Sequence, residues 1–376
     1  MMNRKKKFFL ASALTLAMGL GFYGMATPAY AAAPLKAAQT TAQQSLVTMP
    51  PTYRDVVVDT AKNNNGTERV LKMNVFIPPH EKGTKVPALI YVHGGGWAVG
   101  DYQGNDEIKK DAPKGGGQMR TDYNKTYDVF KGVLDDGIAF VSVDYQLNHE
   151  AQLPAQIYDV KGAIRFVRAH AAEYNIDTDR IAIAGSSAGA HLAAEAALTP
   201  NDPSLEGKIG GNLNQSSAVT ACVDYYGPTD LLSMAHEMSP ALQDCAKAIE
   251  MHDSARANES ILVGATGNGK ADGVAELRKV LQAGDQKSPY WDMAQMALNA
   301  SPINHVTKDA PPFFIAHGGQ DNLVPIAQSL RLQKALNDAG VENVFVYNST
   351  THHGYQGDTT NTAMRAWLKA KLFDKK

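Results

Sequence analysis

The sequence predicts an α/β fold with a mostly parallel central sheet flanked by helices. Short runs rich in Val, Ile, Ala and Phe alternate with amphipathic helical patterns along most of the 376 residues. Continuous apolar runs are typical of strands that are buried on both faces, and their alternation with helices is typical of a parallel sheet. A chain of this length that is 44% hydrophobic and 20% charged can bury a sizeable core.

The N-terminal residues have the pattern of a secretory signal peptide. Residues 4–7 are basic, residues 8–25 are apolar, and residues 29–31 (AYA) form a small-x-small cleavage site. We therefore expect cleavage after Ala31 and a secreted or periplasmic protein. An uncleaved membrane anchor is the alternative. No later apolar stretch is long enough to span a bilayer, so no membrane span is expected after cleavage.

Residues 32–50 predict a flexible linker because they are rich in Ala, Gln, Thr and Ser and lack periodicity. Residues 51–376 are then expected to form one domain. Residues 1–31 hold four of the 36 Lys and Arg and none of the 38 Asp and Glu, so the rest of the chain has a net charge of −6. This charge argues against nucleic acid and anionic membranes as partners.

The elements of the predicted sheet follow one another in a regular order. Strands are expected at residues 70–77, 88–92, 138–144, 180–184, 218–226, 312–316 and 343–347. Helices are expected at residues 153–174, with Pro154 in the first turn, at residues 326–339, which Gly340 ends, and at residues 362–372. Residues 101–126 and 231–300 do not fit the alternation, and we expect them to be insertions at one rim of the sheet.

The chain has two cysteines, Cys222 and Cys245. An exported protein can keep a disulfide, which would stabilise the fold by about 3 kcal/mol. Two buried free thiols are the equal alternative. Without a nearby histidine cluster the cysteines do not indicate a zinc site.

A strand, a small-residue turn and a helix meet in residues 181–194, IAIAGSSAGAHLAA. The turn matches G-x-S-x-G, and this setting is that of a nucleophile elbow. Ser187 is the central serine and therefore the candidate nucleophile, while Ser186 is expected to be structural. The flanking glycines are needed because side chains would collide in so tight a turn.

A serine hydroxyl needs a base within hydrogen-bond reach, and the base needs an acid to orient it. On this type of sheet the order is Ser, then Asp or Glu, then His. His353 follows the last predicted strand and is the candidate base, with His352 as its rival. Asp321 follows the preceding strand and is the candidate acid, and Asp224 and Asp230 are weaker candidates.

A glycine-rich turn after the strand at residues 88–92 predicts an oxyanion hole. The sequence there is YVHGGGW, and glycine backbone can turn N–H groups toward a developing oxyanion. We expect the N–H groups of Gly95, Gly96 and Ala188 to form the hole, with Gly94 also possible. The turn matches neither G-x-G-x-x-G nor G-x-x-x-x-G-K-[ST], which argues against a phosphate loop.

These pieces resemble the α/β-hydrolase carboxylesterases that carry an H-G-G-G loop, in particular the bacterial feruloyl-esterase-like and acetyl-esterase branch. The stretches that carry the resemblance are HGGGWAVGD (93–101), VDYQL (143–147), residues 153–194, DYYGPTDL (224–231), SPINHV (301–306), HGGQDNLVP (317–325) and HHGY (352–355). Ser187, Asp321 and His353 match the triad positions of that family. Ala190 stands where a glycine is frequent, and Gln146 stands where an arginine is usual.

The resemblance implies an α/β-hydrolase fold with rim insertions and hydrolysis of small or aryl and acyl esters through an acyl-enzyme, without metal or cofactor. Feruloyl, acetyl-sugar and gallate esters are the expected substrates of an exported member. A serine peptidase or arylformamidase on the same fold is one alternative, and a catalytically silent binding protein is another. Trp97 and Trp291 are candidates for the substrate pocket. His93, His191, His317 and Asp159 are interpreted as packed, hydrogen-bonded groups, and the sequence leaves the oligomeric state open.

Overall fold

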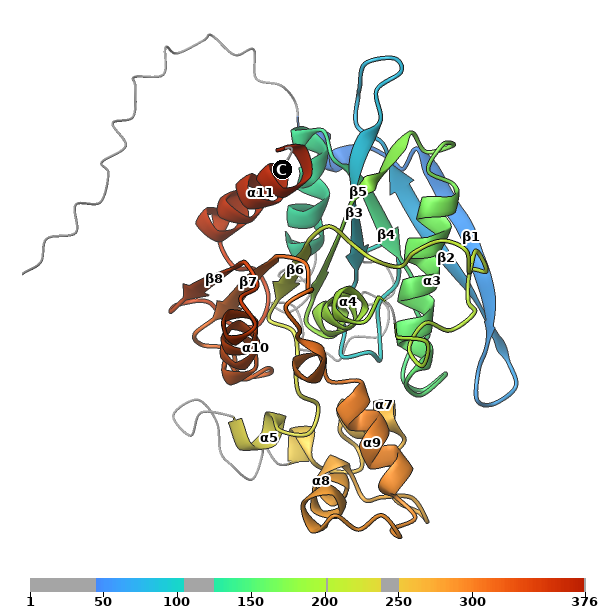
Figure 1. The fold of residues 1–376 in the computed structure, drawn as a ribbon, viewed down its shortest axis with the longest axis vertical. Coiled ribbons are helices and arrows are strands. Elements are labelled where there is room, and N and C mark those ends of the chain that lie inside the picture. Colours follow the sequence, from blue (N-terminus) through green and yellow to red (C-terminus); the bar gives the residue numbers. More distant parts are fainter. Residues whose placement is uncertain (1–44, 105–124, 201, 238–249, 375–376) are drawn as a thin grey trace, which may run out of the picture. The chain divides into compact units, whose positions relative to one another are not determined.

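The computed structural model describes residues 45–104, 125–200, 202–237 and 250–374. Its centre is an eight-stranded sheet in the order β1-β2-β4-β3-β5-β6-β7-β8 (Figure 1). The strands are β1 (Tyr53–Lys62), β2 (Glu68–Phe76), β3 (Val86–Val92), β4 (Ala139–Val143), β5 (Ile176–Ser186), β6 (Cys222–Tyr225), β7 (Phe313–Gly318) and β8 (Asn343–Asn348).

The sheet is parallel from β4 to β8, as the sequence predicts, and antiparallel at the edge formed by β1 and β2. β1 is missing from the prediction because only two of its ten side chains, Val58 and Ala61, are buried. An exposed edge strand lacks the continuous apolar run by which a central strand such as β3 is recognised. The register pairs Val92 with Gly185 and Gly185 with Asp224, so the carboxyl ends of β3, β5 and β6 lie at one edge.

Helices α3 (Ala155–Ala169), α4 (Ala188–Leu198), α10 (Ala327–Asp338) and α11 (Asp358–Phe373) pack against this sheet. Helices α5 (Met234–Glu237), α7 (Asn258–Val263), α8 (Val274–Ala283) and α9 (Trp291–Asn299) lie in the segment between β6 and β7. Short 3₁₀ helices are η1 (Leu46–Thr48), η2 (Gly132–Asp136) and η3 (Pro302–His305).

Alternate side chains of β3 enter two separate apolar clusters, as the period of a strand requires. Ala88, Ile90 and Val92 join the cluster that includes buried side chains of α3, α4 and α10. Leu89 and Tyr91 join the cluster that includes η2 and α11. The sheet is therefore covered on both faces, which explains why β3 and β4 are buried at every position.

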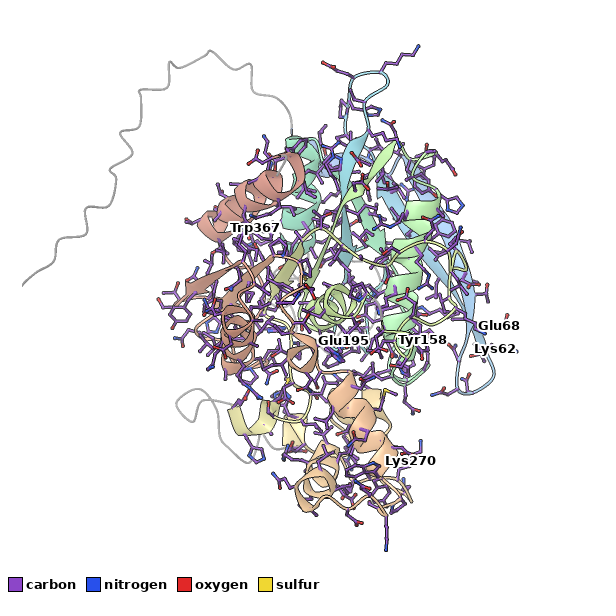
Figure 2. All side chains as sticks on the ribbon, in the orientation of Figure 1. Lys62, Glu68, Tyr158, Glu195, Lys270 and Trp367 are labelled. Carbon is purple, nitrogen blue, oxygen red and sulfur yellow. The ribbon has the colours of Figure 1, made fainter. Side chains whose placement is uncertain are left out.

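Helix α4 is buried along its whole length. Even Glu195, labelled in Figure 2, is fully buried, and its Oε1 lies 3.3 Å from His305 Nε2. Burial raises the pKa of Glu195 well above its usual value. A helix surrounded in this way is a rigid support for the residue at its N-terminus, which is Ser187.

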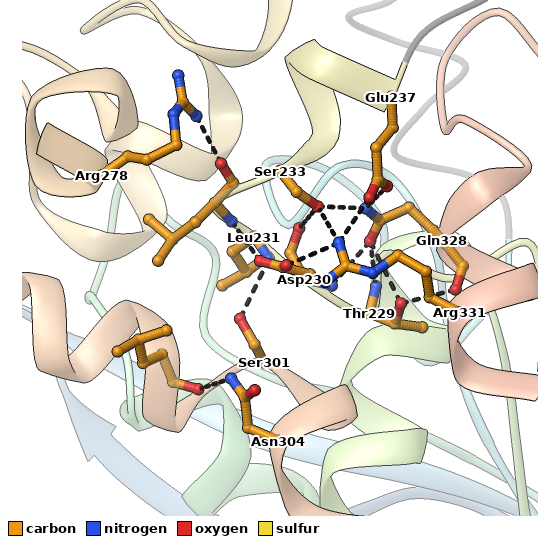
Figure 3. Close-up of polar contacts among 12 residues, drawn as sticks. Thr229, Asp230, Leu231, Ser233, Glu237, Arg278, Ser301, Asn304, Gln328 and Arg331 are labelled. Atoms are coloured by element: carbon orange, nitrogen blue, oxygen red, sulfur yellow. Dashed lines mark hydrogen bonds and ion pairs between the residues drawn. The ribbon is translucent and has the colours of Figure 1, made fainter. Parts of the chain in front are cut away.

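Residues 231–300, predicted as an insertion, contain α5, α7, α8 and α9, and Figure 1 shows α7, α8 and α9 grouped together. Their buried residues Leu262, Leu277 and Ala294 belong to the same apolar cluster as α4. The segment that leads into the insertion is held by α10 (Figure 3). Gln328 Oε1 accepts from the N–H groups of Thr229 and Asp230, each over 2.7 Å.

The N-terminal predictions are only partly covered by the described residues. The signal peptide and most of the linker predicted at residues 32–50 lie outside them, as does most of the insertion at residues 101–126. At the end of that linker the structure differs from the prediction. Residues 46–48 form η1, and both Ser45 Oγ and the Leu46 N–H donate to Asp135. None of the helices that the structure describes is both long and apolar enough to span a bilayer.

Candidate active site

Ser187 stands on a sharp turn between β5 and α4. Its backbone angles are φ 56° and ψ −126°, a conformation that L-residues rarely adopt and that marks functional sites when the surroundings enforce it. Its N–H donates to Tyr225 O over 2.8 Å. A Cβ at Gly189 would lie 2.1 Å from Val92 O, and one at Gly185 would lie 2.2 Å from Gly189 O. Side chains at Gly185 and Gly189 would therefore collide with backbone atoms, so both positions require glycine, as predicted.

The structure brings the three predicted triad residues together from the ends of three strands. Ser187 Oγ lies 2.9 Å from His353 Nε2, and His353 Nδ1 lies 2.7 Å from Asp321 Oδ2. A ring that donates from Nδ1 to the carboxylate has Nε2 free to accept from the serine hydroxyl. The rival His352 instead faces Gln320 O with its Nδ1, at 3.0 Å.

Asp321 is 2% exposed, and its carboxylate accepts hydrogen bonds at both oxygens. Oδ1 accepts from the N–H groups of Leu323 and Val324, each over 2.9 Å. Burial alone would raise the pKa of Asp321, but the charge of His353 and hydrogen bonds from His317 and His353 outweigh it. The pKa of Asp321 therefore lies well below its usual range, and the acid is ionised at neutral pH.

The two weaker candidate acids have other partners. Asp224 Oδ1 accepts from the Gly227 N–H over 2.8 Å, and Asp230 Oδ2 pairs with Arg331 at 2.9 Å. Burial raises the pKa of Asp224 to about 6. Of the three candidates, Asp321 is the one that contacts His353.

Two supports of His353 have no clear signal in the sequence. The Tyr226 ring lies edge-on against the imidazole, with ring centroids 4.6 Å apart. Gln356 is buried, and its Nε2 donates to His352 O and Gly354 O, on either side of His353. Tyr226 is 127 residues away in the sequence, so only the fold could have revealed the contact.

The glycine turn after β3 lies against the nucleophile. A Cβ at Gly94 would lie 2.8 Å from Ser186 O and 3.4 Å from Ser187 Cβ. Gly95 and Gly96 have φ values of 114° and 59°, and Gly95 O accepts from the N–H groups of Ala98 and Val99. Ala188 is the first residue of α4 and directly follows Ser187. The three predicted donors thus belong to segments that adjoin Ser187, and their role as an oxyanion hole stays a prediction.

Buried polar contacts fix the residues around the turn. His93 Nδ1 donates to Gly94 O over 2.8 Å, and its ring stacks on Tyr145 with centroids 4.2 Å apart. Ser186 Oγ lies 3.0 Å from the hydroxyl of Tyr91 inside the sheet, in agreement with the structural role predicted for this serine.

Of the two predicted pocket residues, Trp97 is only 2% exposed. Its indole N–H donates to His191 Nδ1 over 3.1 Å, and His191 Nε2 donates to Ala300 O over 2.7 Å. Trp97 therefore packs in the core and leaves little surface for a substrate. Trp291 opens α9 and is partly buried against the same cluster, and its pocket role stays a prediction. Burial lowers the pKa of His191 to about 4.

Residues 73–336 match the protein family described as BD-FAE. The chain belongs to the BD-FAE family. The match contains Ser187, Asp321 and the glycine turn and ends before His353. Together with the mostly parallel sheet and its flanking helices, membership assigns the α/β-hydrolase fold, and enzymes of this family are in general serine hydrolases that act on carboxylic esters.

Two curated relatives of this chain have names that describe ester hydrolases. Esterase LipQ of Mycobacterium tuberculosis is 32% identical over 74% of this chain and 52% of its own length. The probable carboxylic ester hydrolase LipM of the same organism is 29% identical over 65% of this chain and 43% of its own length. The chain thus spans about half the length of the curated relatives that it matches.

Solved structures give the same fold over nearly the whole domain. A truncated carbohydrate esterase from gut microbiota has a TM-score of 0.60 and 26% identity, covering 86% of this chain and 99% of its own. The bifunctional GH43-CE protein of Bacteroides eggerthii has a TM-score of 0.63 and 26% identity, covering 85% of this chain and 35% of its own.

Proposed function

We propose that this BD-FAE protein is a serine carboxylesterase that works through an acyl-enzyme. The observation that carries the proposal is the Ser187–His353–Asp321 chain, with hydrogen-bond distances of 2.9 and 2.7 Å. The nucleophile on a strained turn beside a glycine loop adds support.

Each residue of the triad has a distinct role in the proposed reaction. Ser187 Oγ attacks the ester carbonyl while its proton passes to His353 Nε2, and Asp321 stabilises the resulting imidazolium. The N–H groups of Gly95, Gly96 and Ala188 receive the oxyanion. His353 then gives the proton to the departing alcohol. Water repeats the sequence on the acyl-enzyme, which releases the acid and restores Ser187.

Hydrolysis of p-nitrophenyl acetate, butyrate and octanoate by the parent and by Ser187→Ala tests the reaction. Loss of the catalytic serine in such a triad costs about 10⁶ in kcat, so Ser187→Ala should have only background activity. Equal activity in both proteins would show that Ser187 is not the nucleophile. A parent that neither hydrolyses these esters nor is labelled by a fluorophosphonate would favour a silent binding protein.

For the natural substrate we propose esters carried by plant polysaccharides, such as acetyl-sugar or hydroxycinnamate esters. The support is the likeness to a carbohydrate esterase and to a bifunctional GH43-CE protein, each at 26% identity. The test compares kcat/KM on acetylated xylan oligomers and methyl ferulate with kcat/KM on simple aryl esters. No preference for either natural ester class would refute the substrate proposal and leave the esterase proposal standing.

Two further parts of the proposal concern location and amide substrates. The basic, apolar and AYA segments of residues 1–31 support export, which N-terminal sequencing of the mature protein tests. Arylacetamide deacetylase of Oryctolagus cuniculus, 31% identical over 43% of this chain, supports a trial of anilide substrates beside the matched esters. A kcat/KM on the anilide above that on the ester would replace the esterase proposal by an amidase.

A further inference from the structure

A second histidine lies behind the catalytic acid. His317 is in β7, four residues before Asp321, and its side chain is fully buried. Its Nε2 lies 3.2 Å from Asp321 Oδ2, the same oxygen that faces His353. Its Nδ1 lies 2.7 Å from Ser329 Oγ on α10. Asp321 therefore has a histidine on either side.

The partners of the ring decide which of its nitrogens carries the proton. Nε2 faces two acceptors, Val324 O at 3.0 Å and Asp321 Oδ2 at 3.2 Å, so this nitrogen must be the donor. In the neutral ring Nδ1 is then an acceptor, and Ser329 is the hydroxyl that donates to it. The serine thus fixes both the tautomer and the tilt of the ring.

We propose that His317 is a positioning residue of the triad, held by Ser329 so that its Nε2–H shares the Asp321 oxygen that serves His353. The inference rests on the proposed esterase function and concerns the same site. His317 does not touch the reacting atoms and acts through Asp321. With the N–H groups of Leu323 and Val324 at Oδ1, it completes four donors around one carboxylate, two at each oxygen.

This arrangement has two consequences for His353. The carboxylate is fixed in its plane because both oxygens are held. The second donor also takes up part of the negative charge on Oδ2 and so limits how strongly Asp321 favours the protonated form of His353. Without the His317 donor, the acid limb of the kcat/KM profile should therefore lie at higher pH.

Other ionisable groups lie near His317, and their contribution to the pH profile must be distinguished from that of His317. Asp224 of β6 interacts electrostatically with His317, and its pKa is raised to about 6 by burial. Tyr226 packs against His317 with ring centroids 6.4 Å apart and interacts with Asp321. Burial keeps the pKa of Tyr226 far above neutral. Among these groups, Asp224 is the one that can titrate near neutrality, so Asp224→Asn is included as a control.

The experiment compares five variants with the parent, one of which is the Asp224→Asn control. His317→Phe keeps a planar ring without a donor, His317→Gln keeps an amide donor near the place of Nε2, and Ser329→Ala removes the group that holds the ring. The matched control is Ser301→Ala, another fully buried serine, whose Oγ bonds to Leu231 N and Ala297 O. Thermal unfolding, kcat and KM on p-nitrophenyl acetate and the pH profile of kcat/KM are measured for each.

We expect His317→Phe to lose about tenfold in kcat with KM unchanged, the equivalent of one strong hydrogen bond. The acid limb of its kcat/KM profile should move up by about half a pH unit. His317→Gln should recover most of both effects, and Ser329→Ala should show a smaller shift of the same sign. The control Ser301→Ala should leave the acid limb in place, as should Asp224→Asn apart from any step near pH 6.

A folded His317→Phe with the kcat and acid limb of the parent would overturn the inference. An equal loss in Ser301→Ala without a shift of the limb would also overturn it, because the loss would then be structural. If His317→Phe does not fold, the Ser329→Ala variant provides the test. An acid limb of its kcat/KM profile that moves up supports the inference, and one that stays in place overturns it. An active parent with unaffected His317 variants refutes the inference alone, whereas a parent that is inactive and unlabelled at Ser187 refutes the proposed function as well.

Discussion

The carboxylate of Asp321 faces four donors, two at each oxygen, and an asparagine in its place can satisfy only part of them. The amide oxygen of Asp321→Asn should turn to the N–H groups of Leu323 and Val324, since leaving these buried donors unpaired costs about 1–3 kcal/mol each. The NH₂ group then faces His353 Nδ1. That nitrogen must give up its proton and accept, so Nε2 of His353 carries the proton and faces Ser187 as a donor.

A ring in this tautomer cannot take the serine proton. The same reversal in a serine triad lowers kcat by about 10⁴, which corresponds to about 5.5 kcal/mol of transition-state stabilisation. The assay is kcat on p-nitrophenyl acetate for Asp321→Asn, with the thermal unfolding midpoint measured to show that the fold is intact. The burial of Asp321 and the two backbone donors keep the side chain in place, so the loss should be in kcat and not in KM.

The control for this variant is Asp224→Asn, which changes a buried carboxylate in the adjacent strand. Asp224 contacts the Gly227 N–H and not His353, so this change should leave kcat within about threefold. An Asp321→Asn protein with kcat within tenfold of the parent would refute the reasoning. A large loss in Asp224→Asn instead would move the role of the acid to that residue.

Three further predictions follow from particular contacts. Gly96→Ala should lower kcat/KM by about tenfold or more, because its φ of 59° strains any side chain and its Cβ would also lie 2.6 Å from Asn258 Nδ2. Asn258→Ala in the same chain should restore the part of the loss that the contact causes, as measured in a double-mutant cycle. Gly189→Ala should prevent folding to an active protein, since its Cβ would lie 2.1 Å from Val92 O; soluble, active Gly189→Ala would contradict this. Burial raises the pKa of Asp159 from 3.8 to about 8, so the protonated carboxyl stabilises the fold at low pH and this stability is lost as pH rises from about 4 to 8. In the parent, the free energy of unfolding measured with urea should therefore fall over this range by up to about 1.4 kcal/mol per pH unit. Asp159→Asn should lack this fall, and an equal pH dependence of the unfolding free energy in both proteins would refute the prediction.

The sequence was sufficient for the residues whose signal is local. Gly185 and Gly189 mark the turn around Ser187. Asp321 and His353 each follow a predicted strand, in the order that the triad requires on this type of sheet. The α/β class follows from continuous apolar runs such as residues 88–92, which enter both apolar clusters in the structure. Each of these signals lies within about ten residues of the feature that it predicts.

The residues that hold the triad in place could not be predicted from the sequence, because their partners are distant along the chain. His317 and Ser329 are on different elements, and a histidine at the end of a strand is by itself an ordinary packed residue. Tyr226 meets His353 only because β6 and β7 are neighbours in the sheet, and β7 in turn pairs with β8.

Cys222 is a buried free thiol, whereas Cys245 lies outside the described residues. The burial of Trp97 could not be predicted for a related reason, since Trp97 pairs with His191 across 94 residues.

Three residues of α10 serve the two parts of the site. Gln328 and Arg331 hold the segment that leads into residues 231–300, as Figure 3 shows, while Ser329 holds His317 behind Asp321. Successive residues of a helix point about 100° apart, so one helix can support both without a shared contact. The triad is thus anchored to the sheet and α10, and the inserted helices begin beyond that anchor. Substitutions on the inserted helices should therefore change KM and substrate preference, whereas substitutions of the residues that hold Asp321 should change kcat.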